Sequence, residues 1–393
     1  MSRIAKCLAQ GPLYEPKMTT IVHLLPHFRN DGNGIVNAVV DLACSQACSG
    51  FQVTCIGAYD GAFAPLLRSR QVAALVIINP RHDPFAQFSY ILRLYALLTR
   101  LRPLVVHAHT VPTALAAKAL QPLLGFNLVT TAHNDPRWRS ALLGVGDRVV
   151  CVSAAVAEGM RRLRISEAKL KVVLNGQLGS PRRPKIAHRP IVAKLDSPAI
   201  LTITGLHTFK GVQDLIEAFS VARKSVPGLS LYIVGHGPAN AKLRRRAAHA
   251  GCEDCIHFLG FVDDPRPYLA HADIFVLASH REAFGLVLAE AREAGCAIIG
   301  TNVGGIPEVL EGGRAGILVP PRDPSALGQA LVRLLTDQDA LKDWQRRALA
   351  NLNWLNVERV SREALAVHDD SRIRAEHAVG AGRPGATKQV PEA

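Results

Sequence analysis

The stretch Glu282-Ala-Phe-Gly-Leu-Val-Leu-Ala-Glu290 carries most of what this sequence says about fold and function. It follows the apolar run Asp273–Ser279, which predicts a strand, and it leads through Phe284 and Gly285 into a predicted helix. A glycine at such a turn lets the backbone approach a ligand, and the amides of a helix N-terminus bind phosphate. The two glutamate carboxylates can accept hydrogen bonds from sugar hydroxyls. Glutamates at this spacing also occur on solvated helix faces, so the surrounding sequence has to decide between the two interpretations.

Length and composition indicate a folded protein with more than one domain. The chain has 393 residues, of which 48% are apolar and 20% are charged. No apolar run reaches the roughly 20 residues that would span a bilayer, and Val72–Ile78 is a candidate for a buried strand. We expect residues 1–17 to form a flexible extension without a signal peptide, and eight cysteines suit a reducing cytoplasm.

Strand-like and helix-like segments alternate along the chain, which is typical of an α/β fold. In the first half we predict strands at Ile21–Leu25, Gln52–Gly57, Val72–Ile78, Leu104–Ala108, Asn127–Thr131 and Arg148–Val152, and helices at Ile35–Ser49, Phe85–Leu101 and Pro112–Leu123. In the second half we predict strands at Ile200–Thr204, Leu229–Val234, Ile256–Leu259, Asp273–Leu277, Ala297–Gly300 and Ile317–Val319, and helices at Val212–Ser225, Ala239–Ala250 and Gly285–Ala294. A further helical stretch runs from Pro324 to about Val367.

The alternation is interrupted once, and this predicts two domains. Residues 181–198 are rich in proline and basic residues, so we interpret them as an interdomain linker between residues 18–180 and residues 199–343. Residues 344–368 form a C-terminal helical segment, and residues 369–393 are polar enough to predict a disordered tail. Two such α/β domains would face each other across a cleft, with ligands at the carboxyl ends of their strands.

Further motifs accompany the opening stretch, namely Ala272–Ser279, Asn302-Val-Gly-Gly-Ile-Pro-Glu308 and Gly316–Pro321. Together they resemble the retaining, nucleotide-sugar-dependent glycosyltransferases of family 4, from about Thr19 to about Leu335. The resemblance implies a GT-B fold, with two Rossmann-like domains facing a central cleft. It also implies that the first domain binds the acceptor, the second binds the nucleotide-sugar, and residues 344–368 pack back on the first domain.

The resemblance assigns roles to individual residues. It implies catalytic roles for His133, Glu282 and Lys210. It implies donor binding by Glu290, Lys210, Gly211, Phe261, Phe284, Gly285, Gly304 and Gly305, with Glu290 on the ribose and Glu282 near the transferred sugar. It places Gly32, Asn33, Gly34 and His109 in a loop that faces the acceptor or a phosphate. From the residues alone, the glycine pair could be an ordinary turn and each histidine a structural residue, and Asn37 replaces the third glycine of a dinucleotide fingerprint.

The sequence departs from the family pattern at two positions. Lys210 matches the family's phosphate-binding lysine, but Gly205 stands where the family has an arginine. Two cations stabilise a leaving diphosphate better than one, so this departure bears on donor affinity and activity; His207 or Arg281 could compensate. Asn134 stands where the family commonly has glycine.

We therefore expect a retaining hexosyltransferase that moves a sugar from a nucleotide diphosphate donor, a UDP-sugar by preference, to a hydroxyl of a lipid-linked or polysaccharide acceptor. No residue is placed as a covalent nucleophile, so same-face displacement is favoured. A non-catalytic nucleotide-sugar-binding homologue is the main alternative, and a nucleotide-sugar epimerase is another. We expect no cofactor and no metal, since Lys210 and helix N-termini can supply the positive charge.

The net charge of +14 would also suit a nucleic acid or an anionic membrane. Its basic clusters, such as Arg182-Arg183-Pro-Lys185, lack interleaved aromatic residues and any nucleic-acid-binding motif, which argues against nucleic acid. The simpler interpretation is solvated helix faces and a basic linker. The alternative is peripheral contact with the inner face of the membrane, for which the predicted helix Phe85–Leu101 is a candidate. We therefore expect a cytoplasmic location.

Overall fold

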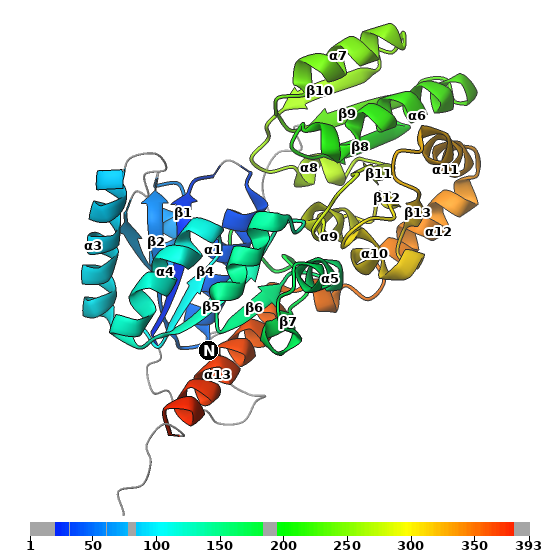
Figure 1. The fold of residues 1–393 in the computed structure, drawn as a ribbon. Coiled ribbons are helices and arrows are strands. Elements are labelled where there is room, and N and C mark those ends of the chain that lie inside the picture. Colours follow the sequence, from blue (N-terminus) through cyan, green and yellow to red (C-terminus); the bar gives the residue numbers. More distant parts are fainter. Residues whose placement is uncertain (1–19, 31, 60, 78–83, 184–194, 381–393) are drawn as a thin grey trace, which may run out of the picture.

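The computed structural model describes residues 20–30, 32–59, 61–77, 84–183 and 195–380, which form two parallel-sheet domains (Figure 1). The first domain contains β1 (Thr20–Phe28), α1 (Gly34–Cys48), β2 (Gln52–Tyr59), α2 (Ala64–Ser69), β3 (Ala73–Val76), α3 (Pro84–Leu101), β4 (Val105–Ala108), α4 (Val111–Leu124), β5 (Asn127–Ala132), η2 (Trp138–Val145), β6 (Arg148–Cys151), α5 (Ala154–Arg162), η3 (Glu167–Lys169) and β7 (Leu170–Val172).

The second domain repeats the same alternation. It contains β8 (Ala199–Ile203), η4 (Thr208–Lys210), α6 (Val212–Ser225), β9 (Ser230–Val234), α7 (Asn240–His249), β10 (Ile256–Gly260), α8 (Arg266–Leu269), β11 (Ile274–Leu277), α9 (Leu286–Glu293), β12 (Ala297–Thr301), α10 (Ile306–Val309), η5 (Glu311–Gly313), β13 (Ile317–Val319), α11 (Pro324–Thr336) and α12 (Gln338–Ala348). The chain ends in η6 (Asn353–Leu355) and α13 (Val357–Gly380).

Both sheets have the strand order of a doubly wound fold. The first runs β3-β2-β1-β4-β5-β6-β7 and the second runs β10-β9-β8-β11-β12-β13, and the pairings within them are parallel. In each sheet the chain changes direction between its first and fourth strands, β1 and β4 in one and β8 and β11 in the other. Ligands bind at such switch points, outside the carboxyl ends of the strands. The loops that follow these four strands are therefore where a site is expected.

The central strands are buried on both faces, which explains their continuous apolar runs. Every residue of β4, β5, β6, β9, β11 and β12 is buried. The edge strand β3 differs from its prediction as a buried strand, because Val76 is 61% exposed. An edge strand has a neighbour on one side only, so an apolar run does not guarantee burial there.

The helix α13 returns from the second domain to the first. The backbone of Leu178 pairs with Leu355 and Val357, and α13 then packs against α1, β5 and β6. This agrees with a C-terminal segment that packs back on the first domain. The predicted disordered tail begins too early, since α13 continues to Gly380; residues 381–393, like residues 1–17 and 184–194, lie outside the described residues.

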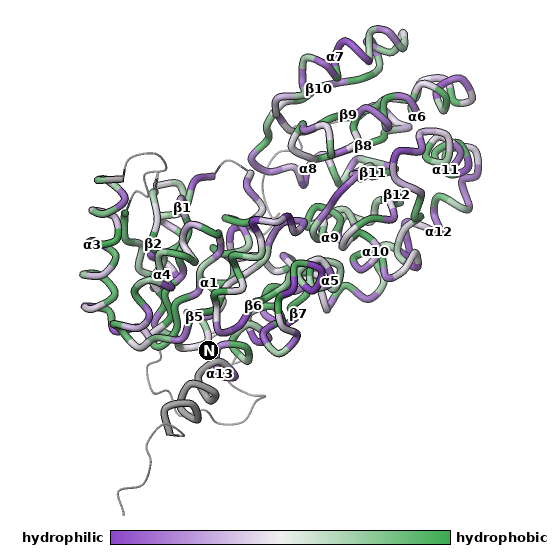
Figure 2. Tube along the Cα trace, in the orientation of Figure 1, coloured by the Kyte–Doolittle hydropathy of each residue, from purple (hydrophilic) through white to green (hydrophobic). Residues whose placement is uncertain are grey.

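Within the described residues, no helix is both long and apolar enough to cross a membrane. The hydropathy colouring nevertheless shows a hydrophobic α3 at the outer edge of the first domain (Figure 2).

Candidate functional site

A cleft of about 850 Å³ lies between the two domains. Its walls come from the loops after β1, β5, β8, β10 and β11 and from α9. Many of the predicted site residues line it, namely Gly32, Asn33, Gly34, His133, Lys210, Phe261, Glu282, Phe284, Gly285 and Glu290. The two switch points of the sheets therefore open into the same space, as the topology requires.

The loop between β11 and α9 forms one wall. Gly285 has φ of +92°, which glycine adopts without strain, and it is the N-cap of α9. The amides of this helix N-terminus therefore open at the cleft. Glu282 lies just before the turn, where its Oε2 pairs with Lys210 Nζ at 2.7 Å.

Three predicted donor-binding glycines lie behind this wall and do not line the cleft. A Cβ on Gly304 would come within 1.7 Å of the Glu282 carbonyl oxygen, and one on Gly211 within 1.7 Å of the Ala278 carbonyl oxygen. The Gly305 amide donates to the Glu282 carbonyl at 3.2 Å. These glycines thus allow close backbone packing against the segment from Ala278 to Ala283.

Glu290 is held by residues from the start of the linker. Its Oε1 accepts short hydrogen bonds from Arg183 and from the Gln177 amide, and Arg183 also lies 3.8 Å from Glu293 Oε2. Burial lowers the pKa of Arg183 to about 10, which leaves it cationic at neutral pH. Next to it, Arg182 makes a two-point ion pair with the buried Asp41 of α1, at 2.7 and 2.9 Å. These two arginines of the predicted basic linker are therefore held in ion pairs.

Each lysine or arginine that lines the cleft in the described part of the chain is paired with a carboxylate. The pairs are Arg182 with Asp41, Arg183 with Glu290, Lys210 with Glu282 and Arg266 with Asp264. The first two arginines come from the linker and were not predicted as site residues. Nothing in the local sequence signals their position, because their partners lie 141 and 107 residues away. An anionic ligand would have to displace these carboxylates in order to bind the lysine and the arginines.

Gly205, at the place of the family's arginine, lines the cleft and has room for a side chain. If a Cβ were added there, its nearest atom would be His207 Cδ2, at 3.4 Å, an ordinary contact. Neither residue proposed to compensate lines the cleft. His207 is exposed, and Arg281 lies over the Phe209 ring and 3.6 Å from Asp135. Arg183 is the cation that the structure brings to the cleft instead.

The loop after β1 forms the opposite wall. Asn33 caps α1, with its Oδ1 accepting from the Ile35 amide at 3.0 Å. Gly32 has φ of +75°, and a Cβ there would come within 2.7 Å of the Phe261 ring in the other domain. The glycine is therefore required both by the turn and by the approach of the two domains. Phe261 itself is 43% exposed, which leaves ring surface open at the cleft.

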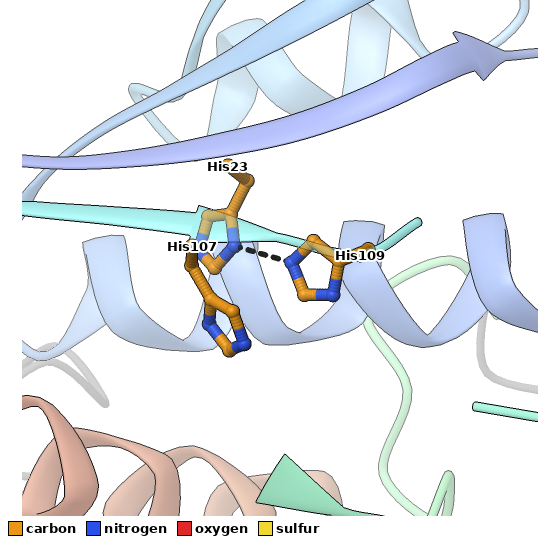
Figure 3. Close-up of side chains that lie close together, drawn as sticks. All are labelled: His23, His107 and His109. Atoms are coloured by element: carbon orange, nitrogen blue, oxygen red, sulfur yellow. Dashed lines mark hydrogen bonds between the residues drawn. The ribbon is translucent and has the colours of Figure 1, made fainter. Parts of the chain in front are cut away.

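His133 lines the cleft at the end of β5, and a row of histidines lies behind it. His109 Nε2 lies 2.9 Å from His23 Nδ1 (Figure 3). His109 Nδ1 lies 3.0 Å from His133 Nε2. His109 is buried and reaches the cleft only through His133, so its predicted place in the acceptor loop is indirect. Burial lowers the pKa of His133 to about 3 and that of His23 to about 4, so both are neutral at neutral pH.

The buried histidines could in principle hold a metal. One ring nitrogen from each of His23, His107 and His109 lies within 4.8 Å of the others. All of their ring nitrogens already have hydrogen-bond partners; those of His107 are Thr131 at 2.6 Å and His368 at 3.1 Å. The cluster is therefore satisfied by its own hydrogen bonds, and we propose no metal there.

Comparison with known proteins shows which protein families the chain matches. Residues 197–337 match the family described as Glycosyl transferases group 1, and residues 32–176 match Glycosyltransferase Family 4. The chain therefore consists largely of two glycosyltransferase domains, one matching each of these families. A glycogen synthase of Mycobacterium tuberculosis is 33% identical over 270 residues, and this alignment spans 63% of this chain and 63% of that relative. An N-acetyl-alpha-D-glucosaminyl L-malate synthase of Bacillus anthracis is 29% identical over 261 residues, 62% of this chain and 68% of the relative.

Solved structures establish the fold of this chain as GT-B. The structure of Anabaena Alr3699/HepE in complex with UDP and glucose has a TM-score of 0.74 at 18% identity, and covers 90% of this chain and 100% of that one. A glycosyltransferase from Rickettsia africae has a TM-score of 0.73 at 18% identity, covering 91% and 99%. At this identity the likeness concerns architecture, and it confirms the prediction of two Rossmann-like domains.

The two domains of the chain also touch beside the cleft. Glu308 supports the start of a helix in the other domain: its carboxylate accepts from the Ala154 and Ala155 amides of α5 at 2.8 and 3.0 Å. A carboxylate at a helix N-terminus is favourable. Ser153 Oγ donates to the Ala283 carbonyl at 2.7 Å, next to Glu282. These contacts tie the position of the first domain to the Glu282 loop.

Proposed function

We propose that this chain is a retaining glycosyltransferase that moves a sugar from a nucleotide diphosphate donor, a UDP-sugar by preference, to a hydroxyl acceptor. The observation that carries the proposal is the wall formed by Lys210, Glu282 and the N-terminus of α9, with Glu290 one turn further along the same helix. Cation, open amides and two carboxylates occur together at one edge of the cleft. Diphosphate and sugar hydroxyls need this combination of groups.

The donor would exchange with the ion pairs that line the cleft. Lys210 would turn from Glu282 to the diphosphate, and Glu282 would then accept from the transferred sugar. The ribose hydroxyls would replace Arg183 on Glu290, and the released guanidinium would supply the second cation that Gly205 does not. Positive charge near the leaving diphosphate stabilises the charge that develops there in the transition state.

For the chemical step we favour same-face displacement. The bond from the anomeric carbon to the leaving phosphate oxygen breaks, and the acceptor oxygen bonds to the same face. The leaving phosphate takes the acceptor proton. His133, on the opposite wall, would hold a hydroxyl of the transferred sugar.

We propose a lipid-linked or polysaccharide acceptor and a role in glycan, exopolysaccharide or glycolipid synthesis at a membrane surface. Support comes from α3, where Phe85, Phe88, Leu92 and Tyr95 form one exposed stripe at i, i+3, i+7 and i+10. Phe85 is 87% exposed and Phe88 is 65% exposed. Residues 84–104 contain no acidic residue, so the stripe would meet anionic headgroups without repulsion.

A second candidate is a nucleotide-sugar-binding homologue that does not turn over. Gly205 favours it, because the cation that family 4 places there is missing. Donor binding without transfer to any acceptor would distinguish this candidate from the transferase.

The first experiment measures thermal shifts of the protein with UDP-, GDP- and ADP-sugars and the bare nucleotides, without added metal. We expect one nucleotide to raise the melting temperature selectively, because only the folded protein binds it. Glu290→Gln should reduce this shift, since the ribose loses a charged acceptor. The exposed Glu253→Gln is the matched control and should leave it unchanged. Absence of any shift, or an equal shift in Glu290→Gln, would contradict the donor assignment.

A further inference from the structure

The row of histidines behind His133 begins at a glutamine. Gln46 of α1 is fully buried, and its Oε1 lies 2.8 Å from His23 Nε2. His23 Nδ1 then faces His109 Nε2 at 2.9 Å, and His109 Nδ1 faces His133 Nε2 at 3.0 Å. An unbroken line of hydrogen bonds therefore runs from helix α1 through the domain core to the cleft.

Each imidazole in this row carries one proton. Burial lowers the pKa of His23 and of His133, and lowers that of His109 well below its usual value. A neutral imidazole has one nitrogen that donates and one that accepts. The direction of any one bond in the row therefore determines the direction of all the others.

Gln46 determines that direction. The Gln46 amide is placed with Oε1 toward His23, and its buried Nε2 has no hydrogen-bond partner among the described residues. In this placement the oxygen can only accept, so His23 donates from Nε2 and accepts at Nδ1. His109 must then donate from Nε2 and accept at Nδ1, and His133 must donate from Nε2 into the row. This leaves Nδ1 of His133 without a proton, and no residue in the described part of the chain hydrogen-bonds to it.

We infer that Gln46 is a positioning residue that sets the tautomer of His133 through His23 and His109, so that His133 offers the cleft an unprotonated Nδ1. His133 would then accept a hydrogen bond from a sugar hydroxyl and could not donate one. This consequence at the sugar rests on the proposed function, whereas the tautomer itself does not.

His107 does not share this row, although its ring stacks on His109 with centroids 4.2 Å apart. Its own nitrogens bond to Thr131 and His368. Thr131 therefore provides a matched control: removing its hydroxyl takes one buried hydrogen bond from a histidine of the same cluster but leaves the row complete.

The test reads the tautomers directly, by two-bond proton–nitrogen correlation spectra of the full chain labelled with ¹⁵N-histidine. We expect His23, His109 and His133 all to carry the proton on Nε2. Gln46→Met removes the acceptor at a similar side-chain length, so His133 should lose its single tautomer and show a resonance typical of Nδ1–H. Thr131→Val should leave His133 as in the wild type.

Two results would overturn the inference: a wild-type His133 protonated at Nδ1, or an unchanged His133 in Gln46→Met. The wild-type spectrum is decisive by itself, so the test survives a variant that does not fold, and His23→Leu breaks the row at a second point. If transfer activity is found, Gln46→Met should lower kcat on the order of tenfold. A protein that binds no donor but shows the expected tautomers would contradict the proposed function and leave this inference standing.

Discussion

At the scale of single residues, Gly205 is one of the two positions at which this chain departs from the family pattern. It lines the cleft, its φ is not in the left-handed region, and a side chain there would meet only His207 at an ordinary distance. We expect Gly205→Arg to fold normally and to lower the Kd for the nucleotide-sugar by about tenfold, since a charge-assisted hydrogen bond to phosphate contributes roughly 1.5 kcal/mol or more. Titration calorimetry measures this.

Thr208→Arg is the matched control for Gly205→Arg, because it adds the same charge to the same loop at an exposed position outside the cleft. Its donor affinity should equal that of the wild type. A turnover that appears only in Gly205→Arg would identify the natural chain as the non-catalytic homologue. If both variants bind the donor as the wild type does, Arg183 already supplies the second charge.

Some residues of the site could be predicted from the sequence, and others could not. Glu282 and Glu290 lie in a strand-to-helix motif, and the family resemblance points to Lys210. The structure brings all three into the cleft. Arg183 could not be predicted, since its sequence neighbours are proline and basic residues. Its burial depends on Glu290, which is distant in the chain and reached only when both domains are folded.

At the scale of secondary structure, apolar runs predicted every strand except β7, and most of the longer helices, to within a few residues. The four-residue helices α8 and α10 were not predicted. The short helices α2 and α5 were not predicted, although Ser153 caps α5 and Val156 and Met160 repeat at helical spacing. Such elements contain too few turns for periodicity to stand out. Prolines at the start of α3, α4 and α11 sit in the first turn, where they cost no hydrogen bond.

The exposed apolar stripe of α3 leads to a prediction about membrane binding. We expect the protein to sediment with vesicles that contain anionic lipid and much less with zwitterionic vesicles, because the apolar stripe inserts while Arg93 and Arg100 meet the headgroups. Phe88→Gln with Leu92→Gln should weaken binding by about tenfold or more, since each side chain contributes roughly 1.5–3 kcal/mol when buried.

The control for α3 is Val221→Gln, which removes an equally exposed apolar side chain from α6 of the other domain. It should bind vesicles as the wild type does. Binding that is independent of lipid charge, or unaffected by the changes in α3, would show that this face is not the membrane surface.

At the scale of the whole molecule, α13 joins the two domains through the histidine cluster. The chain leaves the second domain, crosses back, and places His368 3.1 Å from His107 and Asp370 2.9 Å from Arg148. The C-terminal helix, the first sheet and the cleft wall at His133 thus share one buried network. Five histidines in that network are buried or line the cleft, and burial lowers the pKa of each.

This network makes stability depend on pH in a definite direction. The folded pKa of each histidine lies below the value of about 6.5 in the unfolded chain, so the unfolded chain binds more protons as the pH falls. As far as these histidines are concerned, the protein therefore has its full stability above pH 6.5, and it loses stability as the pH falls toward the folded pKa, which is about 4 for His23.

Urea unfolding between pH 7.5 and 4.5 should show a falling free energy of unfolding, by roughly 2–3 kcal/mol per buried histidine over that range. His23→Leu should flatten the slope by about one proton, whereas the exposed His249→Asn should not, because it removes no buried imidazole. A slope that is zero, or equal in His23→Leu and the wild type, would mean that the buried histidines are already charged in the folded protein.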